Sequence, residues 1–411
     1  MNNIIRTTFL LLSAVVCGSV SAQRLTLSQC QTLAADRNLS LRTADAQVER
    51  ARIMHGTAWD LDKTDIALSQ DPTSGGSPDN AISISQSIEF PTVYTARRRQ
   101  LRAETKAEES RRRIVAVQIN ADIASAYWQL VYENEKLNIL RSQDSLLVSY
   151  AKIARQRYDA GEARLLESLS ADRLLEENAM EIAATQGQIR SVQLTLRTLV
   201  GNDSVITPAD ERLVPIAYTP SAQYNYSTTA EGEYANDRVV VTEKALSVAK
   251  NAYAPSLSLT LKNQLVITGW DPYHENRSRY EGGNFMGFEV GVGVPLFYGA
   301  TKAKVKAAKK DREIAEMERE REQNQLQNEY SNAQSAYNNA LQRMRYYEDK
   351  GMKTAESTAY LGALEYENGE ISYVEYVNAL QESITLRLKR AAVVNEYNQA
   401  VVALQRLRGE F

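Results

Sequence analysis

Four stretches of the chain alternate apolar and polar residues with a period of two. Isoleucines alternate with serines over residues 80–89, leucines with serine and threonine over 255–264, and phenylalanine and valines with glutamate and glycines over 284–294. Residues 62–70 follow the pattern more weakly. Successive side chains of a strand point to opposite faces, so the alternation predicts four strands with one apolar face. Each has about the ~9–11 residues that span a membrane as a tilted strand; an ordinary half-buried sheet is the alternative.

Long segments without proline or glycine follow the predicted strands. Residues 92–160 contain neither residue, and residues 300–350 and 370–408 also lack both. Proline in a helix interior costs ~3 kcal/mol, so these segments are free to form helices, the first of them roughly 100 Å long. A left-handed glycine can end one helix before the next begins, as we expect for Gly161 and Gly369. The segments therefore predict two antiparallel helical hairpins, at about 92–200 and 300–408.

The strand and hairpin pattern occurs twice. Tyr158-Asp159-Ala160-Gly161 recurs 208 positions later as Tyr366-Glu367-Asn368-Gly369, and residues 38–51 match residues 236–249. Such self-similarity is the sequence signature of a structural repeat. We therefore expect an α+β, mainly α fold with duplicated halves, each with two membrane β-strands and a long antiparallel α-helical hairpin. The expected boundaries are a first repeat at 23–201, a linker at 202–235 and a second repeat at 236–411.

The first 22 residues have the features of a secretory signal peptide, which we expect over 1–22. Arg6 gives a short basic start, residues 7–16 are apolar, and Val20-Ser21-Ala22 supplies a small-x-small cleavage site. A lipoprotein signal that ends at Cys17 is the alternative, although Val16 is bulky where a small residue is needed. After cleavage, Cys30 is the only cysteine, so an intramolecular disulfide cannot form.

Composition argues against several classes of function. A net charge of −3 and a pI near 5.8 lack the strongly basic balance of a nucleic-acid-binding domain. The only histidines are His55 and His274, and no metal-binding or nucleophile motif is present, so we expect neither an enzyme nor a bound cofactor or metal. Gly291-x-Gly293 is better explained by close packing in a barrel than by a phosphate-binding loop.

Four strands are too few for one chain to close a membrane β-structure. A barrel needs about eight strands in practice. An open strand edge leaves backbone groups without hydrogen bonds in lipid, which costs several kcal/mol per group. The chain is therefore expected to oligomerise, and the pattern indicates a symmetric channel.

Further motifs accompany the duplicated pattern. They are Leu25-Thr26-Leu27-Ser28-Gln29-Cys30 followed by Asn38, Val294-Pro295-Leu296-Phe297, and the two hairpin turns. In this order and spacing, they make the mature chain resemble the TolC-like outer-membrane efflux family. The resemblance implies a homotrimer in which a twelve-stranded β-barrel in the outer membrane stands over an α-helical tunnel that extends into the periplasm. It also implies export of small molecules or proteins, with a periplasmic adaptor and an inner-membrane pump as partners, and no catalysis by the channel itself.

The resemblance also assigns roles to the hairpin turns. It implies adaptor docking at both tips and a periplasmic constriction just beyond the second tip. Glu375 matches the first acidic position of the family's constriction, whereas Asn378 stands where a second carboxylate is expected. In a trimer, Glu375 forms a ring of like charges that attracts cations; a solvated helix turn is the alternative. The expected docking residues are Tyr158, Gly161, Glu162, Tyr366, Gly369 and Glu370.

Basic residues begin both predicted hairpins. Cations at a helix N-terminus oppose its macrodipole by ~0.3–1 kcal/mol each, so another interaction should favour them there. Both clusters directly follow a predicted membrane strand. We hypothesise a basic collar that contacts the lipid headgroups of the outer membrane, with a solvated surface as the alternative. Its residues are Arg97, Arg98, Arg99, Lys302, Lys304 and Lys306.

Two other classes of protein share part of this pattern. A periplasmic adaptor also has a long helical hairpin, but a single one between lipoyl-like halves, whereas this chain has two hairpins and strands of membrane length. A structural coiled-coil protein or adhesin is the second alternative. Extraction from the outer membrane that depends on detergent would separate a channel from both.

Overall fold

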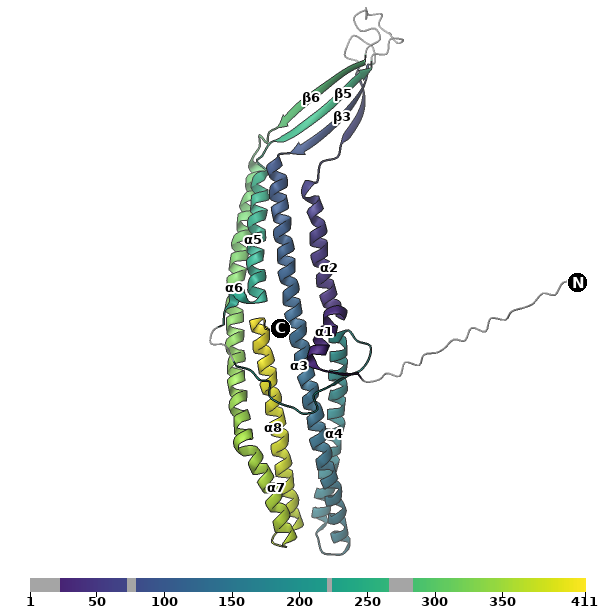
Figure 1. Cartoon of the computed structure of the whole chain (residues 1–411), viewed down its shortest axis with the longest axis vertical. Coiled ribbons are helices and arrows are strands. Elements are labelled where there is room, and N and C mark those ends of the chain that lie inside the picture. The colour runs from purple at the N-terminus through teal and green to yellow at the C-terminus, as the bar shows by residue number, and fades with distance from the viewer. Residues whose placement is uncertain (1–22, 72–78, 220–223, 266–283) are drawn as a thin grey trace, which may run out of the picture. The chain divides into compact units, whose positions relative to one another are not determined.

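A computed structural model describes residues 23–71, 79–219, 224–265 and 284–411 (Figure 1). The described chain is mainly helical, as predicted, with a four-stranded sheet. It divides into two compact units, and the long helices α3 (Pro91–Asp159) and α6 (Gly299–Tyr346) contribute residues to both. Among the described residues, one unit contains 23–39, 119–219 and 333–404, and the other contains 40–71, 79–118, 224–265, 284–332 and 405–411.

The sheet belongs to the second of these units, and its strands come equally from the two halves of the chain. They are β2 (Asp65–Asp71), β3 (Asp79–Glu89), β5 (Ser256–Leu265) and β6 (Asn284–Gly293). All neighbouring strands are antiparallel, in the order β2-β3-β5-β6, and Figure 1 shows β3, β5 and β6 side by side. The pairing of β3 with β5 therefore joins the repeats, and β2 and β6 form the two edges.

The register places every apolar row of the sheet on one face. One row runs across all four strands through Ile66, Ile84, Leu261 and Phe288. The adjacent row, on the other face, runs through Asp65, Ser85, Thr260 and Glu289. The apolar side chains are exposed, with 74% of Ile66 and 78% of Phe288 accessible to solvent. An exposed apolar surface of this extent is unusual for a soluble monomer and marks a surface that contacts lipid or a partner.

Glycines on β6 leave room for serine side chains of β5 on the polar face of the sheet. A Cβ atom added at Gly291 would lie 2.4 Å from Oγ of Ser258, and one added at Gly293 would lie 2.4 Å from Oγ of Ser256. Both glycines therefore allow the strands to pack where a side chain would collide. The sequence predicted packing within a barrel for the Gly291-x-Gly293 pair; the close contact with β5 is compatible with it, and the barrel itself stays a prediction.

Tyr94 fixes the junction between β3 and α3. Its hydroxyl accepts a hydrogen bond from the backbone N–H of Glu89 at 2.9 Å, and its ring stacks on Trp59 at a centroid distance of 5.0 Å. The Glu89 carboxylate in turn pairs with Arg97 at 2.9 Å. These contacts tie the last residue of the strand to the first turns of the helix.

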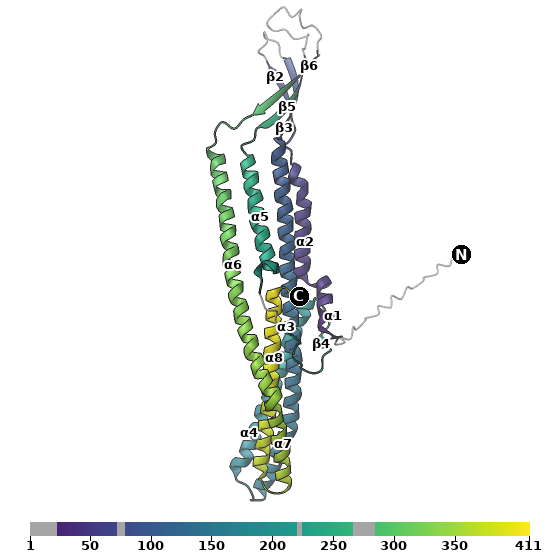
Figure 2. The same ribbon diagram turned by 60° about the vertical axis from the view of Figure 1, so that its left-hand side comes forward.

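Four helices continue from the four strands in the same order. They are α2 (Leu39–Ile53), α3, α5 (Ala230–Asn251) and α6, and both views show them side by side as α2-α3-α5-α6 (Figures 1 and 2). A 3-10 helix, η1 (Met54–Trp59), follows α2. The Thr229 hydroxyl caps α5 by accepting from the N–H of Gly232, so this helix begins inside the linker that we expected over 202–235.

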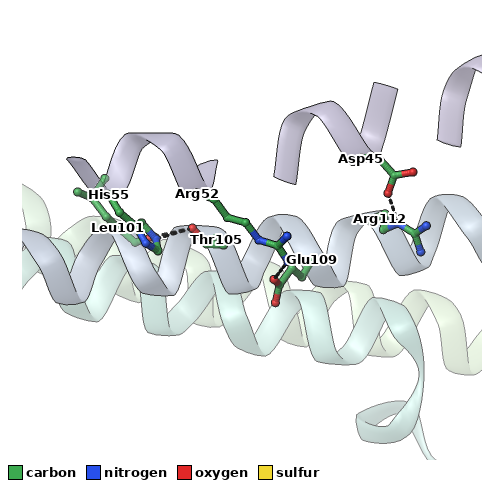
Figure 3. Close-up of polar contacts among 7 residues, drawn as sticks. All are labelled: Asp45, Arg52, His55, Leu101, Thr105, Glu109 and Arg112. Atoms are coloured by element: carbon green, nitrogen blue, oxygen red, sulfur yellow. Dashed lines mark hydrogen bonds and ion pairs between the residues drawn. The ribbon is translucent and has the colours of Figure 1, made fainter. Parts of the chain in front are cut away.

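Polar ladders hold neighbouring helices of this unit together. Between α2 and α3, Arg112 bonds Asp45 and Arg52 pairs with Glu109 at 2.8 Å, and between η1 and α3, His55 Nε2 lies 2.8 Å from Thr105 Oγ1 (Figure 3). The Thr105 hydroxyl donates to the Leu101 carbonyl, so the imidazole N–H donates to Thr105. His55 therefore has a structural role.

A buried carboxylate connects α3 to α5. Asp237 is 6% exposed, and it accepts a hydrogen bond from the Ser110 hydroxyl at 2.6 Å and pairs with Lys106 at 2.9 Å. Both carboxylate oxygens of buried Asp237 therefore have a partner, which offsets the cost of burying its charge. Between α5 and α6, Arg238 pairs with Glu318 at 3.6 Å.

The other unit contains both hairpin turns. In the first hairpin, α3 is followed by α4 (Leu165–Val200). In the second, α6 continues through a π-helical turn (Tyr347–Gly351) and α7 (Met352–Glu367) before α8 (Tyr373–Arg408). The two hairpins share one core, in which Leu147, Tyr150, Ala154, Ala171 and Val377 are buried.

Extended chain from the linker packs along the helices of this unit. The strands β1 (Gln23–Leu25) and β4 (Ile206–Pro208) form a parallel pair, and helix α1 (Leu27–Arg37) follows β1. Further along, the carboxamide of Asn398, which is wholly buried, accepts from the N–H of Ile216 at 2.9 Å and donates to the carbonyl of Val214 at 3.0 Å. Asn398 thus acts as the hydrogen-bonding partner that a neighbouring strand would supply. A short 3-10 helix, η2 (Tyr226–Thr228), precedes α5 in the other unit.

Candidate functional site

Both hairpin tips close with the same backbone motif. Gly161 and Gly369 adopt left-handed φ angles of 76° and 73°, as predicted. In each tip the next residue donates back to the helix: the N–H of Glu162 bonds the Arg157 carbonyl at 2.8 Å, and the N–H of Glu370 bonds the Glu365 carbonyl at 2.8 Å. This pattern satisfies helix carbonyls that would otherwise lack partners. The residues expected to dock an adaptor therefore lie at two turns of equivalent geometry.

The second tip positions Glu375 in a capping box. The N–H of Ser372 donates to Oε2 of Glu375 at 2.8 Å, and the N–H of Glu375 donates to the Ser372 hydroxyl at 3.3 Å. Two backbone donors at the start of α8 are thereby satisfied. The Ser372 N–H, and then its hydroxyl, lower the pKa of the Glu375 carboxyl from its ordinary value. Glu375 is therefore a fully exposed and firmly ionised carboxylate.

In the first tip, the matching carboxylate forms an ion pair. Glu167 pairs with Arg157 at 3.1 Å. The position that matches Arg157 in the second tip holds Glu365, and the position that matches Ser372 in the first tip holds Arg164. Across the described ranges, Glu375 has no such cationic partner. The duplication has therefore diverged into one neutralised carboxylate and one with an uncompensated charge.

The same divergence extends over the whole second tip. Residues 354–386 contain six glutamates and neither lysine nor arginine. The matching residues of the first hairpin, 146–178, contain five basic residues among a similar number of acidic ones. Like charges without counterions raise the local negative potential. The second tip is therefore the more strongly acidic of the two.

Tyrosines fix the second tip in place. The ring of Tyr366 stacks on Tyr376 at 5.0 Å with an interplanar angle of 6°, and Tyr373 lies 5.6 Å from Tyr150 of α3. Burial, followed by the neighbouring tyrosines, raises the pKa of Tyr373. Asn378 is exposed on α8, one turn beyond Glu375. Tyr366 and Tyr158 remain partly exposed, at 37% and 41%.

The structure divides the basic residues of the hypothetical collar. Arg97 is engaged with Glu89, whereas the other five side chains are exposed. At ~100° per helical residue, Lys302 and Lys306 share one face of α6, and Lys304 lies on the opposite face. The set therefore presents more than one surface, and its contact with lipid stays a prediction.

No catalytic or metal centre emerges from the described ranges. They contain no group of three His, Cys, Asp or Glu residues placed to hold a metal ion. Burial raises the pKa of the Cys30 thiol to about 11, so this sulfur stays protonated and unreactive. His274 lies outside the described residues. Among the helices of the described chain, none has the length and apolar content needed to cross a membrane.

Comparison with protein families identifies the class. Residues 31–202 and 235–410 match the family described as Outer membrane efflux protein. The match covers well over half of the chain, with one segment in each repeat. The chain therefore belongs to the outer membrane efflux protein family, whose members are transporters rather than enzymes. A search of curated proteins gave no match.

Solved structures of efflux channels share the fold. The chain is similar to CusC, with a TM-score of 0.76, 16% identity and coverage of 93% of this chain and 91% of that one. The VceC outer membrane protein of Vibrio cholerae gives a TM-score of 0.71, 16% identity and coverage of 93% and 96%. The MtrE outer membrane channel of Neisseria gonorrhoeae, solved in its open state, gives a TM-score of 0.72 and 17% identity, with coverage of 93% of this chain and 88% of that one. At these identities, the likeness establishes the TolC-like fold.

Proposed function

We propose that this chain is the outer-membrane channel of a tripartite export system. Three copies form one twelve-stranded β-barrel in the outer membrane and a helical tunnel that extends into the periplasm. The tunnel receives substrates from an inner-membrane pump through a periplasmic adaptor and passes them to the exterior.

The observation that carries the proposal is the sheet. Its apolar face is exposed, its polar face carries charged and small residues, and β2 and β6 present backbone donors and acceptors at the two edges. Lipid cannot satisfy such edges, whereas pairing β6 with β2 of another copy satisfies both. Membership of the efflux family and the likeness to solved channels support the same assembly.

The tips supply the periplasmic end of the proposed channel. Both docking turns, at Gly161 and Gly369, are preformed and partly exposed, which suits contact with an adaptor. Glu375 carries an uncompensated charge next to the second turn, so three copies would place like carboxylates around one axis. Asn378 adds no charge, so this constriction depends on a single acidic ring.

The assembly is tested by mass and conductance together. Native mass spectrometry of the purified chain in mild detergent should show three copies, and planar bilayers that contain it should show discrete conducting events. Three copies are expected because four strands per chain leave edges that a monomer cannot hide. A stable monomer inserted in the membrane contradicts the proposal, as does a protein that leaves the membrane without detergent. The latter result favours the adaptor or the structural coiled-coil protein.

The collar is tested by binding to lipid. Replacing Arg97, Arg98, Arg99, Lys302, Lys304 and Lys306 with glutamine should weaken association with vesicles of anionic lipid, by up to ~1 kcal/mol for each charge near the surface. The pair Arg98→Gln and Arg99→Gln, which removes two exposed charges of α3, is expected to give about a third of the effect. Unchanged lipid binding with an altered ion selectivity would place the cluster in the lumen instead.

A further inference from the structure

We propose that α6 packs against α2 of a second copy of this chain, and that Glu320 and Arg50 form an ion pair between the copies. The contact uses the face of α6 opposite α5 and the face of α2 opposite α3. It rests on the proposed trimer and names the residues that join its helices.

The order of the helices makes α2 and α6 the outer pair. They continue from β2 and β6, the two edges of the sheet, and lie at opposite ends of the row α2-α3-α5-α6 (Figure 2). If β6 pairs with β2 of the next copy, the helix that follows β6 lies beside the helix that precedes that β2. The partner of the exposed α6 face is therefore α2 of a neighbouring copy.

Contacts inside the chain determine the level of each outer helix, that is, which of its residues lie at the same position along the helix axes. Arg52 of α2 pairs with Glu109 of α3 at 2.8 Å, in the ladder of Figure 3. The next residue of α3, Ser110, bonds Asp237 of α5. On α5, Arg238 follows Asp237 and pairs with Glu318 of α6. Arg52 and Glu318 therefore lie at one level along the helix axes. Rotation about an axis parallel to the helices preserves that level in every copy.

This common level determines which residues of α6 lie opposite which residues of α2 in a neighbouring copy. Helix α2 runs toward the sheet and α6 runs away from it, so Arg50 and Glu320 each lie two residues, ~3 Å, beyond Arg52 and Glu318 on the side away from the sheet. Ile53 and Met317 each lie one residue to the other side of that level. The two charges therefore face each other, and so do the two apolar side chains.

The side chains point the right way for this contact. Glu320 lies ~200° around α6 from Glu318, which faces α5, and Arg50 lies ~200° around α2 from Arg52, which faces α3. Arg50 and Glu320 are exposed, and within the described ranges neither forms an ion pair. Ile53 is 69% exposed and Met317 59%, so both would gain burial in the contact.

Charge complementarity continues toward the sheet. Lys302, Lys306 and Lys309 share the α6 face of Glu320 and are exposed. On the other partner, the segment after α2 and η1 carries exposed Asp60 and Asp62. With increasing distance from the sheet, the exposed charge on this face of α6 changes from basic, at Lys302 to Lys309, to acidic, at Glu320. In the same direction, the charge on the α2 side changes from acidic, at Asp60 and Asp62, to basic, at Arg50. This match favours a second copy over any other occupant of the face.

Charge reversal tests the ion pair. Arg50→Glu and Glu320→Arg should each speed dissociation of the detergent-solubilised trimer by about tenfold or more, since like charges facing each other across an interface cost several kcal/mol. The double variant Arg50→Glu with Glu320→Arg should restore the wild-type rate. Glu243→Arg is the matched control, because Glu243 is an exposed residue of α5, and α5 lies between α3 and α6 of its own chain.

Crosslinking gives an independent readout. Arg50→Cys combined with Glu320→Cys should form disulfide-linked dimers and trimers, while buried Cys30 does not react. Two helices separate these positions within one chain, so a crosslink reports a neighbouring copy. A wild-type trimer with no crosslink and no effect of either reversal overturns this pairing and leaves the proposed function standing. A wild-type monomer overturns both. Charge reversal of Lys302 and Lys306 tests the part of the contact near the sheet. If it changes vesicle binding but not trimer dissociation, these lysines contact lipid, and their proposed contact with Asp60 and Asp62 of a second copy is wrong.

Discussion

Leu261→Arg is expected to prevent insertion of the protein into the outer membrane. Leu261 lies in the middle of the apolar row, opposite Ile84 on one side and Phe288 on the other. An arginine on the lipid-facing side of a barrel costs ~2–4 kcal/mol at the bilayer midplane, and a trimer would bear this cost three times. The variant should accumulate outside the membrane fraction, measured by detergent extraction and by heat-resistant trimer on gels.

Thr260→Arg is the matched control for this prediction. Thr260 is the adjacent residue on the same strand, but it points to the opposite face, in the row with Asp65 and Glu289. An arginine there lies beside the Glu289 carboxylate and, in the proposed barrel, faces water. The control should insert normally and shift the ion selectivity toward anions. Equal insertion of both variants would show that the apolar face does not contact lipid.

The sheet and the hairpin turns could be predicted because each leaves a local signal. Alternation over strands such as 80–89 and 255–264 persists for the full length of the element, and the register then places all apolar rows on one face. Gly161 and Gly369 interrupt long segments without glycine or proline, and a left-handed turn is the conformation that glycine adopts at little cost.

Other elements depend on contacts between distant residues. The strands β1 and β4 have three residues each, too few to establish a period, and they exist because residue 23 lies beside residue 206. The π-helical turn at Tyr347–Gly351 falls where Gly351 is buried against the Tyr347 ring; a Cβ there would lie 2.9 Å from Cδ1. Only Gly351 itself marks this place in the sequence.

The candidate site was found in sequence through the repeated tip, but its electrostatics were not. Ser372-Tyr373-Val374-Glu375 has the spacing of a capping box, which is a sequence signal for the hydrogen bonds of Glu375. The pairing of Glu167 with Arg157 across the first turn has no comparable motif, because it depends on how the turn brings the two helices together. The difference between the two tips therefore required the structure.

Glu375→Gln is expected to reduce the cation preference of the closed channel. Glutamine at the third position of a helix preserves the capping box, so the start of α8 should be unchanged while the charge is lost. Reversal potentials in planar bilayers measure the preference, which salt should screen over a Debye length of ~10 Å at 0.1 M. Block by multivalent cations should weaken as well, with trimer stability unaffected.

The pH dependence follows from the hydrogen bonds of Ser372. They lower the pKa of Glu375, which counteracts the mutual repulsion of carboxylates in a trimeric ring. The cation preference should be lost as the pH falls through the pKa of Glu375 in the ring, and the Ser372 hydrogen bonds keep that pKa lower than it would be without them. Ser372→Ala removes the hydroxyl bond and should shift this loss to higher pH, whereas Glu375→Gln should abolish the pH dependence.

Glu167→Gln provides the matched comparison from the first repeat. The change removes a carboxylate that Arg157 already neutralises, so it leaves an unpaired cation at a tip whose negative potential is weaker. We expect a smaller shift in reversal potential than for Glu375→Gln, together with a loss of tip stability of about 0.2–1 kcal/mol, typical of a partly exposed ion pair. Equal shifts from the two variants, or none from Glu375→Gln, would refute the assignment of the constriction to Glu375. The acidic tips would then be solvated surface, and the difference between Arg157–Glu167 and Ser372–Glu375 would concern only how each helix begins.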